Sequence, residues 1–315
     1  MLLNKKFYSV ILLSLSFVFV SSAVFAKKNK EIKHSIFIAG PQFTGIIDEE
    51  GEVVFDTKRP HARDGYVLPN GNILVCWTTV VLEYDKDTKE VVFEFKRRAP
   101  KFPKEKIELS ALQRLDNGNT LIVESSSTPK IMEVDPKGKI LSETPLQPET
   151  ENVHMQTRMA RKLPNGNYLV PHLLAFAVKE YTPEGKVVNT IKTDLEELGG
   201  SKVHNWPFTA IRLKNGNTVA NLTNGNKTAV FDKDGKVVWS MSNDDVEGTP
   251  FRDPCGGQVL KNGNIVICSY GAKDGIKIFE VNKDKEIVWK YEGYRAHDFQ
   301  ILTTNGKPVK GKPMK

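Results

Sequence analysis

The residues in this sequence that are best suited to chemistry are histidines with arginines near them. His61, His154, His204 and His297 each stand a few residues before a copy of a repeated motif, and Arg158 lies between His154 and its motif. Such imidazoles can hold a divalent metal, act as nucleophile and base, or bind an anion or a sugar. Arginine favours an anionic ligand. We therefore take these five residues as the catalytic candidates and leave the presence of a metal open.

The repeated motif identifies the elements that must position these side chains. The motif reads Leu-x-Asn-Gly-Asn, and its glycines are 47, 48, 50 and 47 residues apart, with a degenerate sixth copy 43 residues after the fifth. Repeats of about 48 residues are typical of β-propeller blades. The five regular copies begin at Leu68, Leu115, Leu163, Leu213 and Leu260.

Each repeat contains four short runs suited to strands. Pro and Asn suit the centre of a type I turn, and Gly suits the left-handed position after it, so the motif predicts a hairpin between a first and a second strand. Apolar runs such as 73–75 and 80–84 follow, then a turn containing Asp and Lys, and a fourth strand. Four antiparallel strands per repeat form a propeller blade. Only residues 194–198 are expected to form a helical turn.

The two ends of the chain complete one blade between them. Residues 35–39, 43–47 and 52–55 look like second, third and fourth strands, and residues 298–302 look like a first strand. Joining them removes the exposed edges of an open array. The sequence therefore predicts an all-β, six-bladed propeller that occupies residues 27–315 as a single domain, closed by the C-terminal strand.

This architecture places the candidate residues on one face. First strands line the central channel of a propeller, and the loops that enter them lie opposite the motif hairpins. Three kinds of polar residue are candidates for ligand binding. Some lie at these entries, one follows a second strand, and the others form a ring two positions before the motif leucine. The candidates are His172, Arg63, Asp64, Arg161, Trp206, Arg252, Gln258 and Gln300.

The repeats also resemble a known group of proteins. Leu163-Pro-Asn-Gly-Asn-Tyr-Leu169 and Asp232-Lys-Asp-Gly-Lys-Val-Val-Trp239 are similar to repeats of bacterial quinoprotein-like and arylsulfotransferase-like propellers, over residues 34–306. The sulfotransferase resemblance implies transfer of a sulfuryl group through a covalent histidine, with His61, His154, His204, His297 and Arg158 as the candidates. The quinoprotein resemblance implies eight blades with a repeated Trp motif. Here only Trp239 and Trp289 match that motif, so we do not expect pyrroloquinoline quinone to bind.

Residues 1–26 predict export. Lys5 and Lys6 precede an apolar segment, and small residues up to Ala26 form a cleavage site, which predicts a signal peptide and a periplasmic or secreted protein. The alternative is an uncleaved membrane anchor, since the uncharged run is long enough to cross a bilayer as a helix; after cleavage no membrane association is expected. The chain carries 45 Lys and Arg against 38 Asp and Glu, and its lysine-rich stretches at 27–33 and 307–315 lack interleaved aromatics. We therefore expect solvated tails and no nucleic-acid partner.

The three cysteines exclude a disulfide framework, and free thiols are favoured. Cys255 is expected opposite Ser269, out of register with Cys268.

The sequence leads to one functional hypothesis and three alternatives. The first is a His- and Arg-rich central site that binds or acts on a small, polar, anionic molecule or a glycan. The alternatives are an arylsulfate sulfotransferase-like enzyme, a metal-dependent lyase or lactonase with several of these groups around one ion, and a platform that binds a protein partner without catalysis. The cofactor, if any, is not identified by the sequence.

Overall fold

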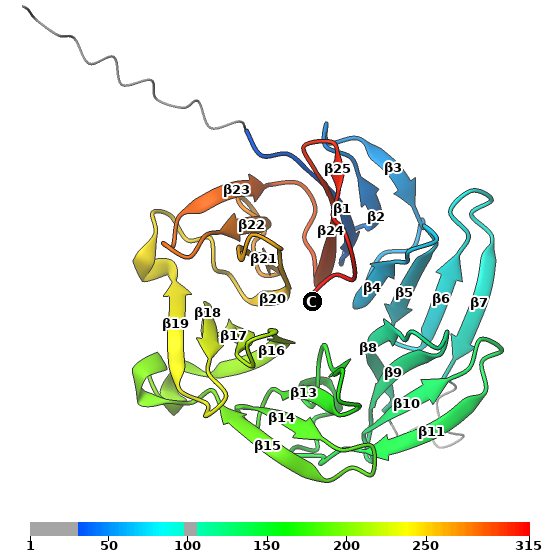
Figure 1. Ribbon diagram of the computed structural model, residues 1–315, viewed down its shortest axis with the longest axis horizontal. Coiled ribbons are helices and arrows are strands. Elements are labelled where there is room, and N and C mark those ends of the chain that lie inside the picture. Colours follow the sequence, from blue (N-terminus) through cyan, green and yellow to red (C-terminus); the bar gives the residue numbers. More distant parts are fainter. Residues whose placement is uncertain (1–30, 98–105) are drawn as a thin grey trace, which may run out of the picture. The chain divides into compact units, whose positions relative to one another are not determined.

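Six antiparallel sheets surround a central axis, each turning its first strand inward (Figure 1). The computed structural model describes residues 31–97 and 106–315, so the expected signal peptide at 1–26 lies outside the described residues. One compact unit spans Ile32–Lys315. The sheets confirm the predicted six-bladed propeller with four antiparallel strands per blade.

The strands of blades 1 to 3 follow one another along the chain. Blade 1 contains β4 (Asp64–Val67), β5 (Ile73–Trp77), β6 (Val80–Tyr84) and β7 (Val91–Lys96). Blade 2 contains β8 (Glu108–Arg114), β9 (Thr120–Ser125), β10 (Lys130–Val134) and β11 (Ile140–Pro145). Blade 3 contains β12 (Arg161–Lys162), β13 (Tyr168–His172), β14 (Ala177–Tyr181) and β15 (Val187–Lys192).

Blades 4 and 5 continue in chain order, and blade 6 then combines strands from the two ends of the chain. Blade 4 contains β16 (Asn205–Arg212), β17 (Thr218–Asn224), β18 (Lys227–Phe231) and β19 (Val237–Ser242). Blade 5 contains β20 (Pro254–Val259), β21 (Ile265–Ser269), β22 (Ile278–Val281) and β23 (Ile287–Tyr291). Blade 6 has the order β25 (Lys307–Pro308), β24 (Asp298–Thr304), β1 (His34–Ala39), β2 (Thr44–Ile47) and β3 (Val53–Asp56).

Helical structure is limited to single 3₁₀ turns in the described part of the chain. They are η1 (Val153–Met155), η2 (Glu196–Leu198), η3 (Ser201–Val203) and η4 (Asn243–Asp245). Residues 194–198 therefore contain the expected turn. None of the helices in the described ranges has the length and apolar character needed to span a membrane.

The motif hairpin has the expected geometry. In blade 1 the Gly71 amide donates to the Leu68 carbonyl oxygen at 2.8 Å, and Gly71 has a φ of +89°. The Asn70 side chain accepts from the Asn72 amide at 3.1 Å, which rigidifies the turn. The Asn72 side chain then donates to Glu83 of the third strand at 2.8 Å. Each residue of the motif thus has a local structural role.

A related contact joins neighbouring blades near the motif hairpins. In four seams, a third-strand glutamate is paired with a cationic or titratable side chain of the next blade. In the other two seams both corresponding residues are apolar. Among the described residues, no seam keeps only one charged partner, because a buried charge without its partner would be costly. The charged pairs are Glu83–Arg114, Glu133–Lys162, Glu180–Arg212 and Glu280–His34. The apolar pairs share clusters and are Val230 with Val259 and Ile46 with Val67.

The C-terminal segment departs from the expected solvated tail. After β25, Met314 forms a bridge with Val259, and Lys315 lies buried at the centre of the ring of blades (Figure 1). Only the end of the segment, residues 313–315, is therefore packed against the first strands, whereas Lys307, Lys310 and Lys312 remain exposed as expected. Burial of Lys315 follows from its contact with Asp298, which the composition of the segment alone does not indicate.

The cysteines are free and buried, as expected. One detail of the register was wrong. Pro254, and not Cys255, pairs with Ser269, because the strand bulges between Pro254 and Gly257.

Candidate functional site

A cavity of about 530 Å³ opens at the entries to the first strands, opposite the motif hairpins. Its walls come from these entries, from the adjoining parts of first and second strands, and from turns after second strands. Within the residues that the structure describes, no strand of blade 2 contributes a lining residue, whereas the other five blades each contribute at least one, blade 6 through His297 at the entry to β24. Blade 3 contributes the long connection before β12. The lining residues are His61, Arg63, Thr78, His154, Met155, Arg158, Leu173, Trp206, Phe208, Thr223, Asp253, Cys255, Tyr270 and His297.

Arg158 is the most unusual of these residues. Its side chain is buried, with the residue only 3% exposed, and its guanidinium donates to the backbone oxygens of Thr157 and His154 and lies over the ring of Phe208. No carboxylate in residues 31–97 and 106–315 forms an ion pair with it. Burial, with Arg63 nearby, lowers the pKa of Arg158 to about 10, so the side chain remains charged at neutral pH. The nearby charge of Glu108 acts on Arg158 but forms no ion pair with it. A buried charge without a directly paired counterion is costly, which makes Arg158 a ready partner for an anion.

Glu108 links two of the candidate residues, Arg63 and His154. It forms an ion pair with Arg63 at 2.9 Å and is hydrogen-bonded to Nδ1 of His154 at 3.0 Å. The hydrogen bond from His154, together with the charge of Arg63, lowers the pKa of Glu108 to about 2. With Nδ1 of His154 donating to this carboxylate, the Nε2 atom is left to accept a proton or a hydrogen bond.

His297 presents a second imidazole to the cavity. Its Nδ1 lies 3.0 Å from the carbonyl oxygen of Ala62, so this nitrogen carries the proton and Nε2 carries the lone pair. Burial lowers the pKa of His297 to about 3, which keeps the ring neutral at ordinary pH. The ring of Tyr270 stacks on it, with centroids 4.1 Å apart.

Trp206 forms an aromatic wall of the cavity. His204 stacks on its outer side, with ring centroids 5.5 Å apart and planes 15° apart, and is itself exposed and not part of the lining. The buried Nε1 of Trp206 has no hydrogen-bond partner among the described residues. His204 therefore supports the Trp206 ring by stacking on it.

Several entry loops have strained backbone. His61, His204 and Asp253 have φ values of +65°, +56° and +50°, in the left-handed region that residues other than glycine rarely occupy. Such strain occurs at functional sites, where surrounding contacts hold it in place. Here it recurs at the entries to three different blades around the same cavity.

Two of the predicted ligand-binding residues lie below the cavity in a buried charge network. Arg161 donates to both carboxylate oxygens of Asp64, at 2.9 and 3.2 Å, and the Nζ of Lys315 is paired with Asp298. Burial raises the pKa of Asp298 to about 7, aided by the nearby Asp64. Burial would also raise the pKa of Asp64, but Arg161 and Lys315 outweigh it and lower that pKa. The charges of this network are paired with one another.

Gln258 and Gln300 connect first strands of adjacent blades. The Oε1 atom of Gln258 accepts from the amide of Ile301 at 2.8 Å, and that of Gln300 accepts from the amide of Val67 at 3.0 Å. First strands of neighbouring blades do not pair directly, so these side chains satisfy backbone groups across the seams.

His172 and Arg252 also lie outside the cavity lining. His172 is buried, and its Nε2 lies 2.9 Å from the hydroxyl of Tyr181. Arg252 is partnered with the exposed Asp274 at 2.6 Å. The structure thus brings together His61, His154, His297, Arg158, Arg63 and Trp206, and leaves the other candidates apart from them.

The sequence reasoning did not single out several lining residues. Thr78 and Tyr270 follow second strands and Thr223 lies near the end of one, positions already expected to share the face of the site. Phe208 and Cys255 lie in first strands, where nothing in their residue type distinguished them from core. In the described ranges, no group of three His, Cys, Asp or Glu side chains is arranged to hold a metal ion.

Comparison with known proteins places this geometry among propellers. A protein of unknown function from Bacteroides caccae has a similar structure, with a TM-score of 0.71 and 20% identity over 85% of this chain and 98% of that chain. Virginiamycin B lyase from Staphylococcus aureus is also similar, with a TM-score of 0.52 and 13% identity over 73% of this chain and 69% of that chain. At these identities the likeness shows the fold alone.

No curated protein matches the chain. The bacterial neighbours support the propeller, while the finer resemblance to arylsulfotransferase-like proteins stays a prediction. A family model covers most of the sequence, from residue 22 to residue 267, and the chain belongs to the Mal s 1 allergenic protein-like family.

Proposed function

We propose that this protein is exported and that its central cavity binds a small anionic molecule with a flat or ring-shaped body. The observation that carries the proposal is Arg158, a buried guanidinium that faces the cavity without an ion-pair partner in the described part of the chain. An arriving anion would supply the missing counterion. Export rests on the signal-like segment at residues 1–26.

The remaining lining suits the rest of such a ligand. Trp206, Phe208 and Tyr270 provide aromatic surface, and rings of ligands pack well against aromatic side chains. A bare inorganic ion would use only part of this surface, so we expect an aryl or sugar anion to bind more tightly than sulfate or phosphate.

Calorimetric titration of the mature chain, residues 27–315, tests the proposal. The probes are 4-nitrophenyl sulfate, 4-nitrophenyl phosphate and glucuronate, each compared with inorganic sulfate and phosphate. Saturable binding of at least one organic anion is expected, and Arg158→Met should weaken it at least tenfold, since a charged hydrogen bond contributes about 1.5–3 kcal/mol. Release of nitrophenolate would reveal turnover in the same samples.

Arg252→Met is the matched control, because Arg252 lies at a strand entry but outside the cavity lining and is partnered with Asp274. It should leave affinity unchanged. Equal losses in the two variants would mean that general positive charge, and not the cavity, attracts the anion. Binding that survives Arg158→Met would remove the basis of the proposal.

A further inference from the structure

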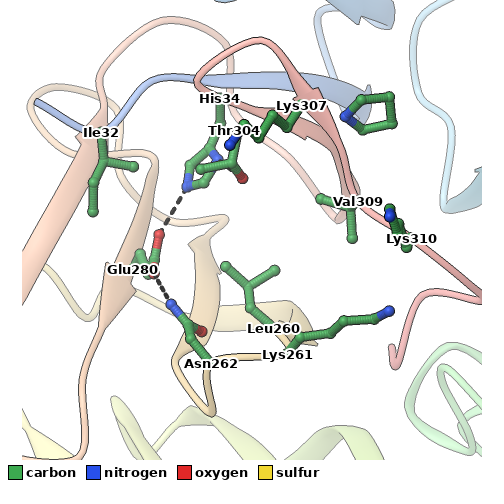
Figure 2. Close-up of a pocket in the computed structure, with 11 residues that line it drawn as sticks. Ile32, His34, Leu260, Lys261, Asn262, Glu280, Thr304, Lys307, Val309 and Lys310 are labelled. Atoms are coloured by element: carbon green, nitrogen blue, oxygen red, sulfur yellow. Dashed lines mark hydrogen bonds and ion pairs between the residues drawn. The ribbon is translucent and has the colours of Figure 1, made fainter. Parts of the chain in front are cut away.

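A second cleft, of about 410 Å³, lies on the opposite face at the seam between blade 5 and blade 6. One wall is the motif hairpin of blade 5, with Leu260 and Lys261. The other is the segment that continues from β24 through β25, with Lys307, Val309 and Lys310 (Figure 2). Of the six blades, only blade 6 carries a fifth strand, so this wall has no counterpart at the other seams.

The rim of this cleft is positive. Lys261, Lys307 and Lys310 line it, and none of the three forms an ion pair with a described carboxylate. Figure 2 shows Lys261 extending from the wall that carries Leu260, and Lys310 on the opposite wall beside Val309. Other surface lysines, such as Lys285, are paired with carboxylates.

Glu280 carries the only carboxylate among the described residues that line this cleft, and this carboxylate is hydrogen-bonded within the protein. Glu280 accepts from His34 at 2.7 Å and from Asn264 at 2.6 Å, and its side chain is 1% exposed. Burial would raise the pKa of Glu280, but the hydrogen bonds from His34 and Asn264 outweigh burial and lower it. Glu280 is therefore a buried structural anion that does not neutralise the lysines at the rim.

The interior between the lysines is apolar. Ile32, Leu260, Pro308 and Val309 line it, and Figure 2 shows Leu260 and Val309 facing each other across the cleft. An apolar floor beneath a positive rim is complementary to a molecule with an anionic head and a hydrocarbon body.

We propose that this cleft binds a free monocarboxylic acid with a straight hydrocarbon chain of about six to ten carbons, in keeping with the size of small-ligand pockets. The carboxylate lies among Lys261, Lys307 and Lys310, and the chain packs between Leu260 and Val309. This site is separate from the central cavity and does not depend on the function proposed for that cavity.

A chain-length series tests this assignment. Butanoate, hexanoate, octanoate and decanoate are titrated into the mature chain, residues 27–315, and binding is followed by calorimetry. Because each buried methylene contributes about 0.8 kcal/mol, affinity should increase up to about fourfold per methylene until the cleft is filled. The same affinity for all four acids would mean that lysines attract carboxylates without a cleft, and would overturn the proposal.

Variants then locate the bound acid. Lys307→Ala with Lys310→Ala should weaken octanoate binding at least fivefold, and Lys283→Ala, which removes an 85% exposed lysine elsewhere on blade 5, should not change it. Val309→Thr keeps the side-chain shape and adds a hydroxyl, so it should reduce the gain per methylene. An unchanged gain would show that the chain does not lie on Val309.

The central cavity and membranes are the two competing explanations. Arg158→Met should leave octanoate binding intact, and loss of binding in that variant would assign the acid to the central cavity instead. Vesicles of phosphatidylcholine with phosphatidylglycerol should not compete with octanoate. Competition by vesicles would mean that the cleft recognises a membrane surface, and the proposal for a free acid would fail.

Discussion

Arg158 and Arg161 are three residues apart, are both buried, and have opposite surroundings. Arg161 lies in the channel below the cavity, where Asp64 receives two of its hydrogen bonds. Arg158 lies in the cavity wall and, among the described residues, has backbone oxygens and an aromatic ring as partners but no carboxylate. Among the described residues, one arginine thus forms an ion pair with a buried carboxylate, and the other forms no ion pair.

We interpret this difference as one between a structural role for Arg161 and the binding role proposed for Arg158. A buried ion pair costs a great deal when one partner is removed, whereas a buried charge with no counterion destabilises the fold that carries it. The channel network of Asp64, Arg161, Asp298 and Lys315 fits the first description. The cavity around Arg158 fits the second, in which some stability is given up for function.

Arg161→Met gives the largest expected effect. It leaves Asp64 buried without its main counterion, and removal of one partner from a buried pair costs about 3–5 kcal/mol. Urea denaturation measures the loss of unfolding free energy. The double variant Asp64→Asn with Arg161→Met should regain part of the loss, because it leaves no uncompensated charge. A loss below about 1 kcal/mol in the single variant would contradict a structural role for the network.

Lys315→Met should have a somewhat smaller effect that depends on pH. Without the Nζ group, the buried Asp298 has lost a counterion, but a proton can neutralise this carboxyl group, whose pKa is already raised to about 7. The variant should therefore lose about 2–4 kcal/mol at pH 8 and clearly less at pH 5. Urea denaturation at the two pH values checks this. An equal loss at both would show that Lys315 acts by packing alone.

The fold could be predicted from the sequence because its signals are local and repeated. The motif Leu68 to Asn72 specifies a turn through the conformations of Asn and Gly, and six repeats fix the number of blades. The position of Lys315 could not be predicted in this way. Its burial depends on an ion pair with Asp298 and on a hydrogen bond that Arg161 donates to the Lys315 backbone oxygen. Arg161 is 154 residues away in the sequence, and no local pattern encodes such a contact.

The repeats also allowed part of the candidate site to be predicted. The rule that first-strand entries share a face brought His61, His154, His297, Arg63 and Arg158 together. The rule could not separate Arg158 from Arg161, because it fixes the strand on which a residue lies and not the depth or partner of its side chain. It likewise treated Gln258 and Gln300 as ligand groups, although their amide oxygens satisfy backbone donors across the seams.

The variants His172→Gln and His297→Gln compare how two buried histidines, one outside the cavity and one lining it, affect the pH dependence of stability. Burial lowers the pKa of each to about 3, against an ordinary value of 6.5. The unfolded chain therefore binds more protons between these values, and stability falls as pH decreases from 6.5 towards 3. Replacing His172 should reduce that slope by up to about 1.4 kcal/mol per pH unit.

Urea titrations between pH 4 and 7 measure this slope for His172→Gln and, as a paired variant, for His297→Gln. Both should flatten the pH dependence, but only His297→Gln should also change anion binding, because only His297 lines the cavity. An unchanged slope in His172→Gln would mean that this imidazole is not held neutral in the folded protein.

Arg158→Met should have the smallest effect on stability. Methionine retains the apolar contact with Phe208 and removes a buried charge, which offsets the loss of hydrogen bonds to Thr157 and His154. We expect the unfolding free energy to change by less than about 1 kcal/mol, or to increase, while anion binding is lost. Measured beside Arg161→Met, this variant is the sharpest test of the comparison. A loss as large as that of Arg161→Met would mean that Arg158, too, belongs to the structural framework, whereas retained stability with lost binding would mean that its charge is kept for a ligand.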